Sequence, residues 1–330
     1  MERKINWGIL STAYIAVEQV IPAMKKSKYC NLLGIASRDE KKAVEKSIMF
    51  DIPKSYGSYK DLLEDDEIEA VYIPLPNHLH VPWAIKALQK GKHVLVEKPI
   101  GLNTIESRNL MKESQKYPSL KVMEAFMYKF HPQWIKIKEL VQSGFIGELK
   151  SIQSSFSFFD DNPASIVNKK EYGGGSLMDI GCYPISLSRY LFNSEPRSVS
   201  AKIEYHKELG VDLLTSSVME FDSGHSSFFC STILEENQKV EIFGTNGIIT
   251  VPVPFNPDKN KPSKLVIRRQ NTKSEIEFEI CDQYEIQVDH FSVNILNDEI
   301  PQISLQDSIN NLHIIEKIFE SDEAGKSVLI

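Results

Sequence analysis

Residues 11–15, with the sequence STAYI, join an apolar stretch to a helical one at a point where an anion can bind. In dinucleotide-binding folds this turn carries three glycines, which permit the tight turn, the close approach of a pyrophosphate and the packing of the helix. Here Ser11, Ala13 and Ala16 occupy those places, and Gly8 lies upstream in the strand. A serine hydroxyl and the first amides of a helix can still bind phosphate. The segment is therefore either a phosphate loop without glycines or an ordinary strand–helix corner.

A second polar group, Ser37-Arg38-Asp39, follows the next apolar run. In this fold an acidic side chain at that place binds the ribose of NAD, and an arginine accommodates the 2′-phosphate of NADP. A guanidinium can make two charge-assisted hydrogen bonds to a phosphate and can stack on adenine. The alternative is that Ser37 or Asp39 caps a helix and that Arg38 is a surface residue. The position favours the first interpretation and predicts NADP(H) over NAD(H) as the cofactor.

The elements that must position these residues alternate between short apolar runs and helical periodicity over the first 125 residues. The predicted strands are 5–10, 30–37, 69–75, 92–97 and 120–125, and the predicted helices are 15–26, 39–49, 59–66, 79–90 and 103–116. The strands lack clean alternation, which is typical of strands buried on both faces. This repetition of strand and helix predicts an α/β Rossmann-type domain with a doubly wound parallel sheet over residues 1–125.

The pattern changes after residue 125. The predicted elements there are a helix over 132–142, an alternating strand over 149–159, a helix over 176–192, strand-like sequence over most of 197–281, and helices over 284–297 and 304–321. Residues 126–330 are therefore predicted to form a C-terminal α+β domain with a large, mostly antiparallel sheet. The three glycines at 173–175 are interpreted first as a flexible turn and second as a wall of the active site.

The composition is that of a globular chain and argues against several kinds of partner. The chain has 330 residues, of which 42% are hydrophobic and 25% are charged, and its net charge is −7. This length suffices for two domains. A negative net charge argues against general nucleic-acid binding, which depends on neutralising phosphates. The basic stretch 260–273 is interpreted as a solvated hairpin surface rather than as a polyanion site.

Neither a metal site nor a membrane segment is predicted. The four cysteines are scattered without a C-x-x-C motif, and no carboxylate or cysteine set accompanies His78 and His80. The sequence contains no run of about 18 apolar residues and no apolar core of a signal peptide. We therefore expect a soluble, cytoplasmic protein that holds no metal.

Four segments connect the chain with a known family. They read YIPLPNHLH (72–80), EKPIGLN (97–103), MEAFMYKFHPQ (123–133) and GGGSLMDIGCYPI (173–185). In this order and spacing they resemble the glucose–fructose oxidoreductase/inositol dehydrogenase (Gfo/Idh/MocA) family, in the branch with dimeric dihydrodiol dehydrogenases and NADP-dependent D-xylose dehydrogenases. The segment STAYIA is similar to a loop variant of that branch. The resemblance covers essentially the whole chain.

The resemblance implies a nicotinamide-dependent oxidoreductase that acts on a sugar, a polyol or a related compound. It also implies roles for three residues: Lys98 takes the place of the active-site lysine, Tyr183 that of an acid/base tyrosine, and Asp179 that of an aspartate four residues earlier. Inositol dehydrogenases have a histidine where this chain has Tyr183, which argues against inositol oxidation. The second domain is then the one that binds substrate and mediates self-association.

These residue types suit hydride transfer, in which a proton must also move at the substrate oxygen. A phenol titrates at about pH 10 in water, and a nearby ammonium stabilises its phenolate, so Lys98 would bring Tyr183 toward working pH. Lys98 could equally polarise the substrate oxygen itself. Asp179 and Tyr183, at i and i+4, share one face of a helix, where Asp179 could orient the substrate or the lysine. The sequence does not decide whether Lys98 or Tyr183 transfers the proton.

The remaining candidates lie in the matched segments or near the carboxyl ends of predicted strands, where the loops line the cofactor crevice. Tyr56 is assigned either to the cofactor or to packing of a turn, and Tyr128 and His131 face the substrate in the family's arrangement. The cofactor-binding candidates are Ser11, Thr12, Ala13, Tyr14, Ile15, Ser37, Arg38, Tyr56, Leu75, Pro76, Asn77, His80, Glu97 and Lys98, and the substrate-binding candidates are Tyr128, His131, Asp179 and Tyr183.

The expected activity is NADP(H)-dependent hydride transfer between nicotinamide and the CH–OH or C=O group of a sugar-like substrate, with Lys98 and Tyr183 as acid/base and polarising groups. One alternative is an activity like that of the dihydrodiol dehydrogenases. The other is a dinucleotide-dependent sensor without turnover, although a pure binding module has no chemical need for Lys98, Asp179 and Tyr183. By resemblance, the open face of the second sheet is the expected surface of a homodimer or a higher homo-oligomer, and neither nucleic acid nor membrane is an expected partner.

Overall fold

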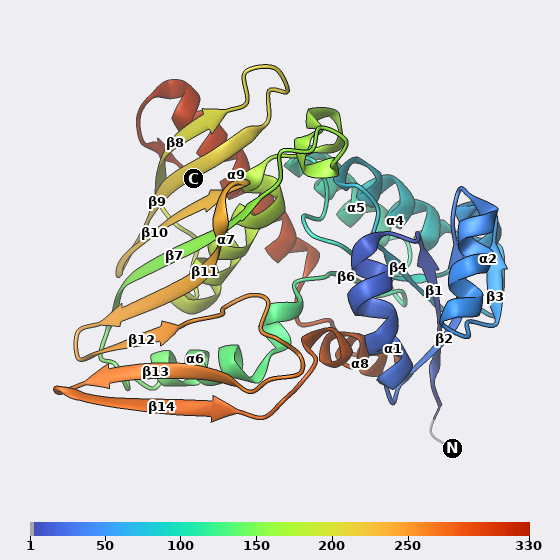
Figure 1. Cartoon of the computed structure of the whole chain (residues 1–330), viewed down its shortest axis with the longest axis horizontal. Coiled ribbons are helices and arrows are strands. Elements are labelled where there is room, and N and C mark those ends of the chain that lie inside the picture. The colour runs from blue at the N-terminus through green and yellow to red at the C-terminus, as the bar shows by residue number, and fades with distance from the viewer. Residues whose placement is uncertain (1–2) are drawn as a thin grey trace. The chain divides into compact units, whose positions relative to one another are not determined.

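The computed structural model describes residues 3–330 and divides the chain into two compact units (Figure 1). The first unit runs to Met127 and includes Asp282–Ile309, and the second comprises Tyr128–Cys281 and Asn310–Ile330. The boundary drawn from the sequence at residue 125 lies close to Met127. The assignment of everything after residue 125 to one domain differs from the structure, because Asp282–Ile309 returns to the first unit.

The first unit contains a six-stranded parallel sheet with the strand order β3-β2-β1-β4-β5-β6. Its strands are β1 (Ile5–Leu10), β2 (Cys30–Ala36), β3 (Lys54–Tyr56), β4 (Ala70–Ile73), β5 (His93–Val96) and β6 (Val122–Glu124). Every residue of β4 is buried, as in a strand covered on both faces. The predicted Rossmann-type sheet is confirmed. The sequence does not predict the edge strand β3, because KSY contains no apolar run.

Helices connect these strands and begin at identifiable caps. They are α1 (Ile21–Lys26), α2 (Glu40–Met49), α3 (Tyr59–Leu63), α4 (His80–Gln89) and α5 (Thr104–Ser114), with a π-helical turn at Ala16–Val20 before α1 and a 3-10 turn at Asn77–Leu79 before α4. The side chains of Asp39, Ser58 and Asn103 accept hydrogen bonds from backbone amides and cap α2, α3 and α5. These caps set the length of the loops that follow the strands.

Helix α8 (Gln283–Leu296) belongs to the first unit although it lies late in the sequence. The indole Nε1 of Trp7 donates to Ser292 Oγ at 3.1 Å, and the rings of Trp7 and Phe291 lie 5.7 Å apart. The hydroxyl of Ser27 donates to the carboxylate of Asp289. An amphipathic pattern predicts a helix but not the sheet that it covers, so this return appears only in the tertiary structure.

The second unit contains a nine-stranded sheet with the order β14-β13-β12-β11-β7-β10-β9-β8-β15. Its strands are β7 (Leu149–Phe159), β8 (Ser198–Tyr205), β9 (Asp212–Phe221), β10 (Gly224–Ser231), β11 (Ile233–Gly244), β12 (Gly247–Val251), β13 (Ser263–Arg269), β14 (Thr272–Phe278) and β15 (Val328–Leu329). Strands β7 and β10 are parallel, and the other paired neighbours are antiparallel. The predicted α+β unit with a mostly antiparallel sheet is confirmed.

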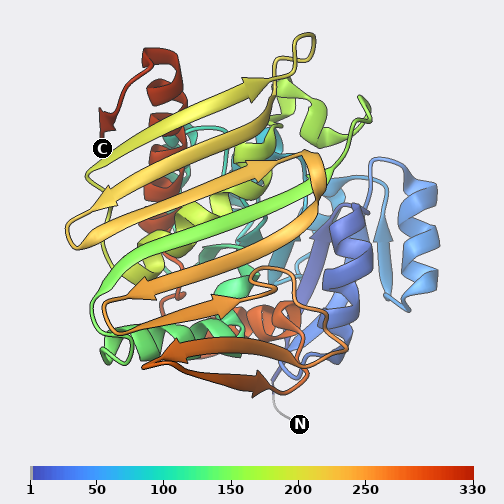
Figure 2. The same cartoon turned by 60° about the vertical axis from the view of Figure 1, so that its left-hand side comes forward.

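One face of the nine-stranded sheet carries helices and the other is open, as Figure 2 shows. The helices are α6 (Pro132–Gln142), α7 (Cys182–Phe192) and most of α9 (Leu305–Ala324). Burial alternates along β9, where Thr215 and Ser217 are buried while Ser216 and Val218 are exposed. Successive side chains of a strand point to opposite faces, so the exposed residues define the open face.

Two kinds of feature are absent from residues 3–330. No helix in this range combines the length and the apolar composition that crossing a membrane requires. No three His, Cys, Asp or Glu side chains in the same range gather closely enough to hold a metal ion.

Candidate functional site

The predicted cofactor residues follow the carboxyl ends of neighbouring strands in the first unit. Ser11–Ile15 follows β1, Ser37–Arg38 follows β2, Leu75–Asn77 follows β4, and Glu97–Lys98 follows β5. Strands β1 and β4 are paired although β2 and β3 lie between them in the sequence, so the strand order reverses at this pair. Ligands of doubly wound sheets bind at the carboxyl edge beside such a reversal. The sheet therefore brings most of the predicted cofactor residues to the edge where a dinucleotide would bind.

The loop after β1 turns tightly into the helical segment that follows it. Ser11 has a φ of 158°, at the edge of the backbone region that favours glycine, and its Oγ accepts a hydrogen bond from Ala13 N at 3.0 Å. Ala16 is fully buried, which allows the close packing of the following helix. Thr12 and Ile15 are partly exposed, and Tyr14 is 80% exposed. A phosphate at this loop would face the first backbone amides of the helix that opens there.

Gly8, upstream of that loop, allows close packing between a helix and the sheet. A Cβ at Gly8 would lie 2.6 Å from a side-chain atom of Leu62 in α3, so its absence allows α3 to pack against β1. The displaced glycine of the sequence therefore serves packing of the sheet rather than contact with a phosphate.

At the end of β2, the acidic side chain of Asp39 and the cationic side chain of Arg38 have different surroundings. The carboxylate of Asp39 accepts from Lys41 N at 3.1 Å and caps α2, and Ser37 Oγ accepts from Asp39 N at 3.2 Å. Arg38 is exposed and forms no ion pair within residues 3–330. The Asp39 carboxylate is therefore engaged as a helix cap, whereas the Arg38 guanidinium remains exposed at the end of β2.

Tyr56, at the end of β3, takes part in packing of the turn. Its hydroxyl donates to Asp65, and that carboxylate also accepts from Lys54 Nζ. Burial and the Asp65 carboxylate raise the pKa of Tyr56 above the usual value of a phenol. A Cβ at Gly34 would lie 2.8 Å from the Tyr56 ring, so the ring covers β2 at this glycine. These contacts favour the packing role that the sequence left open.

The loop after β4 contains one candidate whose contacts differ from the expectation. Leu75 is buried, whereas Pro76 and Asn77 are partly exposed. His80 is 1% exposed, and its two ring nitrogens lie 2.6 Å from Leu75 O and 2.7 Å from Pro99 O. The expectation of direct contact between His80 and a cofactor disagrees with this geometry, because both ring nitrogens already have backbone partners.

Lys98 lies in a turn that several side chains hold in place. Tyr72 of β4 donates through its hydroxyl to Glu97 at 2.6 Å, and Glu97 accepts from the backbone amide of Lys98 at 3.3 Å. The carboxylate of Glu124, at the end of β6, accepts from Ile100 N at 2.7 Å. The Lys98–Pro99 peptide bond is cis. Groups from β4, β5 and β6 therefore fix the backbone that presents Lys98, while its own side chain is partly exposed.

Tyr284, in α8, lies near the same turn of the first unit. Burial and the Glu97 carboxylate raise the pKa of Tyr284 above the usual value, and the Lys98 ammonium acts in the opposite direction. Tyr284 therefore lies within electrostatic reach of both residues. The sequence analysis missed Tyr284, because only the return of α8 to the first unit brings it there.

In the second unit, the triple glycine is required by close contacts. A Cβ at Gly174 would lie 2.4 Å from Val167 O, and a Cβ at Gly175 would lie 1.9 Å from Asp212 Oδ1. Gly173 has a φ of 76° and Gly175 a φ of 107°, a region that other residues rarely adopt. The segment is therefore a tightly packed corner rather than the flexible turn that the sequence first suggests.

The buried side chain of Asp212 is the reason that this corner is tightly packed. It is 2% exposed, and its Oδ2 accepts from Leu177 N at 2.6 Å, Ser176 Oγ at 2.7 Å and Thr215 Oγ1 at 3.3 Å. The pKa of Asp212 lies above its usual value, because the effect of burial outweighs these hydrogen bonds, which lower the pKa. The carboxylate thus fixes the start of the helical segment that carries Asp179 and Tyr183.

That helical segment is not α-helical throughout. Leu177–Gly181 is a π-helical turn, and α7 begins at Cys182, so Asp179 and Tyr183 do not share one face of a regular α-helix. Single π-helical turns occur frequently at functional sites. Asp179 is partly exposed, whereas Tyr183 is 5% exposed.

The two predicted substrate residues near α6 have contacts within the second unit. Tyr128 donates to Ser186 Oγ at 2.9 Å, and its ring lies 5.9 Å from that of Tyr183. His131 Nδ1 accepts from Gln133 N at 3.1 Å, and its Nε2 lies 3.3 Å from Cys281 Sγ. Burial lowers the pKa of His131 to about 4, so the ring is neutral at pH 7. Tyr128 borders Tyr183, whereas His131 acts first as the cap of α6.

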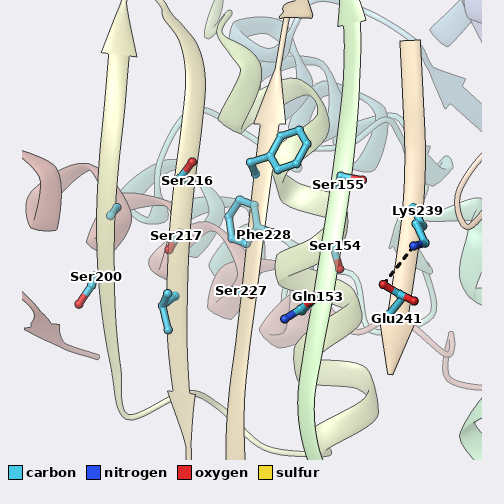
Figure 3. Close-up of a pocket in the computed structure, with 13 residues that line it drawn as sticks. Gln153, Ser154, Ser155, Ser200, Ser216, Ser217, Ser227, Phe228, Lys239 and Glu241 are labelled. Carbon is cyan, nitrogen blue, oxygen red and sulfur yellow. Dashed lines mark ion pairs between the residues drawn. The ribbon is translucent and has the colours of Figure 1, made fainter. Parts of the chain in front are cut away.

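A shallow hollow of about 510 Å³ lies on the open face of the nine-stranded sheet (Figure 3). The lining residues whose side chains are at least partly exposed on this face include Gln153, Ser155, Ser216, Ser227 and Phe229. Its charged side chains, Lys239 and Glu241, pair with each other at 3.0 Å. This hollow offers no acid, base or nucleophile prepared for chemistry, so we do not assign the active site to it.

The fold and the strand-end residues define a Rossmann-type oxidoreductase with an added α+β unit. Residues 5–126 match the oxidoreductase family with an NAD-binding Rossmann fold, and residues 134–250 match the GFO/IDH/MocA C-terminal domain. The chain therefore belongs to the Gfo/Idh/MocA family of oxidoreductases, as the sequence motifs indicate.

Individual relatives extend over nearly the whole chain. The D-xylose 1-dehydrogenase (NADP(+)) 2 of Haloferax volcanii is 36% identical, with 98% of each chain covered. The trans-1,2-dihydrobenzene-1,2-diol dehydrogenase of Xenopus laevis is 33% identical over 82% of this chain and 81% of its own. A crystal structure of KijD10, a 3-ketoreductase from Actinomadura kijaniata in complex with NADP and TDP-benzene, is 26% identical, with a TM-score of 0.90 and coverages of 96% and 98%.

Proposed function

We propose that this protein is an NADP(H)-dependent oxidoreductase that interconverts the CH–OH and C=O groups of a sugar or a sugar-like substrate. The observation that carries the proposal is the fixed position of Lys98 at the carboxyl end of β5, on the edge of the parallel sheet beside the strand-order reversal. The xylose dehydrogenase and the 3-ketoreductase among the relatives support a substrate with a sugar hydroxyl or ketone.

The proposed chemistry divides the work between cofactor and protein. The nicotinamide, when bound, supplies or accepts the hydride. Lys98 polarises the substrate oxygen or stabilises the phenolate of Tyr183, and the phenol exchanges a proton with that oxygen. Asp179 orients the substrate or the lysine. Lys98 belongs to the first unit and Tyr183 to the second, so their joint action is part of the proposal.

Arg38 carries the proposed preference for NADP(H). Replacing it with Ala is expected to weaken NADPH binding by about 10- to 100-fold, the effect of losing one hydrogen-bonded charge partner. NADH has no 2′-phosphate, so its affinity should change little. Fluorescence titration of each variant with NADPH and NADH measures both effects. Lys42→Ala, which removes an exposed cation from α2, is the matched control. Equal losses for the two nucleotides would remove Arg38 from the 2′-phosphate site.

The first test of the whole proposal is the same titration on the unaltered protein, followed by a substrate screen. Tight NADPH binding with weak NADH binding is expected, and D-xylose and D-glucose are then offered with NADP⁺ while absorbance reports NADPH formation. If neither nucleotide binds, the segment 11–15 is only a strand–helix corner and the proposed activity fails with it.

Oxidation of a trans-dihydrodiol is the second candidate function, and the relative from Xenopus laevis favours it. The rings of Tyr128, Phe156 and Phe255 pack around Tyr183 and are buried, so they do not distinguish a sugar from a flat ring. The substrate screen separates the two candidates if a dihydrodiol is included with the sugars.

We also propose that the open face of the nine-stranded sheet pairs with a second copy of the chain. In support, this face lacks covering helices, and Val218 is 41% exposed among serines. A two-fold interface brings the same patch of both copies together. Val218→Lys would therefore place like charges at the interface and convert the dimer to monomers in sedimentation experiments. A wild-type protein that sediments as a monomer at micromolar concentration would contradict this proposal.

A further inference from the structure

His80 connects two loops of the proposed site from a buried position. It is the first residue of α4, directly after the 3-10 turn that follows β4. Its Nε2 lies 2.6 Å from Leu75 O, in the loop after β4, and its Nδ1 lies 2.7 Å from Pro99 O, in the loop after β5. The side chain is 1% exposed, so water does not compete for these contacts. One ring thus spans the two loops that bracket the edge of β4 and β5.

Which of the two contacts is a hydrogen bond depends on which ring nitrogen of His80 carries a proton. Both partners are carbonyl oxygens, which only accept hydrogen bonds, whereas a neutral imidazole has one N–H. Burial lowers the pKa of His80 to about 4, the two carbonyls act in the opposite direction, and the nearby Lys98 and His78 oppose a second proton. A neutral ring therefore donates to one of the two carbonyls at a time, and which one depends on the nitrogen that carries the proton.

The bridge acts on the turn that presents Lys98. Pro99 O belongs to the residue directly after Lys98, and the Glu97 and Glu124 carboxylates also anchor this turn. Those carboxylates accept from the amides of Lys98 and Ile100 and leave the carbonyl of Pro99 to His80. Without the imidazole, the turn would lose the contact at Pro99 O and keep those at the amides of Lys98 and Ile100.

We propose that His80 is a positioning residue, which ties the loop after β4 to the Lys98–Pro99 turn and thereby fixes the place from which Lys98 acts on the substrate. This inference rests on the proposed role of Lys98. It reassigns His80 from contact with the cofactor to support of the lysine. A displacement of about 1 Å in a reacting group can cost about 100-fold in rate.

Three substitutions separate the two ends of the bridge. The amide nitrogen of Asn can occupy the place of Nδ1 and that of Gln the place of Nε2, so H80N retains a donor toward Pro99 O and H80Q one toward Leu75 O. H80L retains neither. With D-xylose or the best substrate of the screen, H80L should lower kcat by about 10- to 100-fold, the usual effect of losing a supporting hydrogen bond. H80N should recover more of kcat than H80Q does, while NADPH affinity changes little in all three.

A double substitution shows whether His80 acts through Lys98. If it does, H80L should cost little further activity in a K98A background, because the group that it positions is already gone. Equal losses of kcat from H80L in the wild-type and K98A backgrounds would overturn the proposal. If K98A alone keeps full activity, the role of Lys98 fails instead, so the two failures are distinguishable.

Hydrogen exchange gives a readout that needs no substrate. H80L should accelerate amide exchange in residues 75–79 and 97–103, the two loops that the ring connects. His93→Leu is the matched control. His93 is a partly buried histidine whose Nδ1 accepts a backbone hydrogen bond from Lys121 N at 2.9 Å, but it begins β5 at the opposite end of the strand. It should leave exchange in 97–103 unchanged. Unchanged exchange in 97–103 of H80L would show that His80 does not hold this turn.

Discussion

Replacement of Lys98 by Ala is expected to lower kcat by about 10²- to 10⁴-fold, the range that general acid–base groups contribute. The side chain is partly exposed at the carboxyl end of β5, and the backbone that presents it is fixed by Glu97 and Glu124. Removing the ammonium withdraws the positive charge that stabilises a phenolate or a developing alkoxide. NADPH affinity should change far less than kcat. Steady-state kinetics together with NADPH titration measure both quantities.

Tyr183→Phe supplies the second half of this test. It removes only the hydroxyl and keeps the ring packed against Tyr128 and Phe255. If the lysine acts through the phenol, the double variant should be scarcely slower than either single variant, because groups that act as a unit are not additive. Multiplied losses would mean that Lys98 polarises the substrate oxygen independently of Tyr183.

Lys121→Ala is the matched control for the lysine. Lys121 directly precedes β6 in the same sheet and pairs with Asp298 at 2.6 Å. It lies at the amino end of its strand, whereas Lys98 follows the carboxyl end of β5. This variant should keep the wild-type kcat. Full activity of K98A, or an equal loss in K121A, would remove Lys98 from the catalytic machinery.

Gly175→Ala is expected to destabilise the second unit by about 3 kcal/mol, from strain at a positive φ and from steric overlap. Gly175 has a φ of 107°, and a Cβ there would lie 1.9 Å from Asp212 Oδ1. Asp212 cannot withdraw easily, since its other oxygen holds Leu177 N, Ser176 Oγ and Thr215 Oγ1. Any relief would displace the start of the segment that carries Asp179, so kcat should fall even where the protein stays folded. Denaturant unfolding and kinetics on the same preparation test both effects.

Gly144→Ala separates backbone strain from the steric contact. Gly144 has a φ of 69° in the same unit, and a Cβ there would meet nothing within 4 Å. Its substitution should cost only about 1 kcal/mol, the penalty of a left-handed conformation, and should leave kcat unchanged. Equal losses of stability in the two variants would show that Asp212 does not restrict Gly175.

Much of the architecture follows from local patterns in the amino-acid sequence. Apolar runs without alternation predict the buried strands of the first sheet, and period-two alternation predicts β7 with its observed bounds. The rule that parallel strands present their carboxyl ends at one edge is sufficient to find the loops 11–15, 37–38, 75–77 and 97–98. The motifs for Lys98 and Tyr183 add a family to this framework. Local sequence thus determines the class of fold, the family and most of the candidate site.

Other parts of the site depend on contacts between residues far apart in the chain. Asp212 meets Ser176 across 36 positions, and Glu124 meets Ile100 across 24. Asp212 and Glu124 are each a single carboxylate in a strand that is expected to be buried. A buried carboxylate needs a hydrogen-bonding partner, and this is the one sign by which the sequence could have drawn attention to them. Nothing in their local pattern names the amide or hydroxyl that each will bind.

The sequence by itself therefore determined the alternation of strands and helices in the first unit apart from β3, the dinucleotide-type sheet and the strand ends where chemistry is expected. Only the tertiary structure decided that α8 returns to the first unit with Tyr284, that the triple glycine accommodates a buried carboxylate, and that the ring nitrogens of His80 contact two loops. The physical reason is that periodicity reports which side of an element is buried, whereas the partner of a buried polar group is set by which elements pack together.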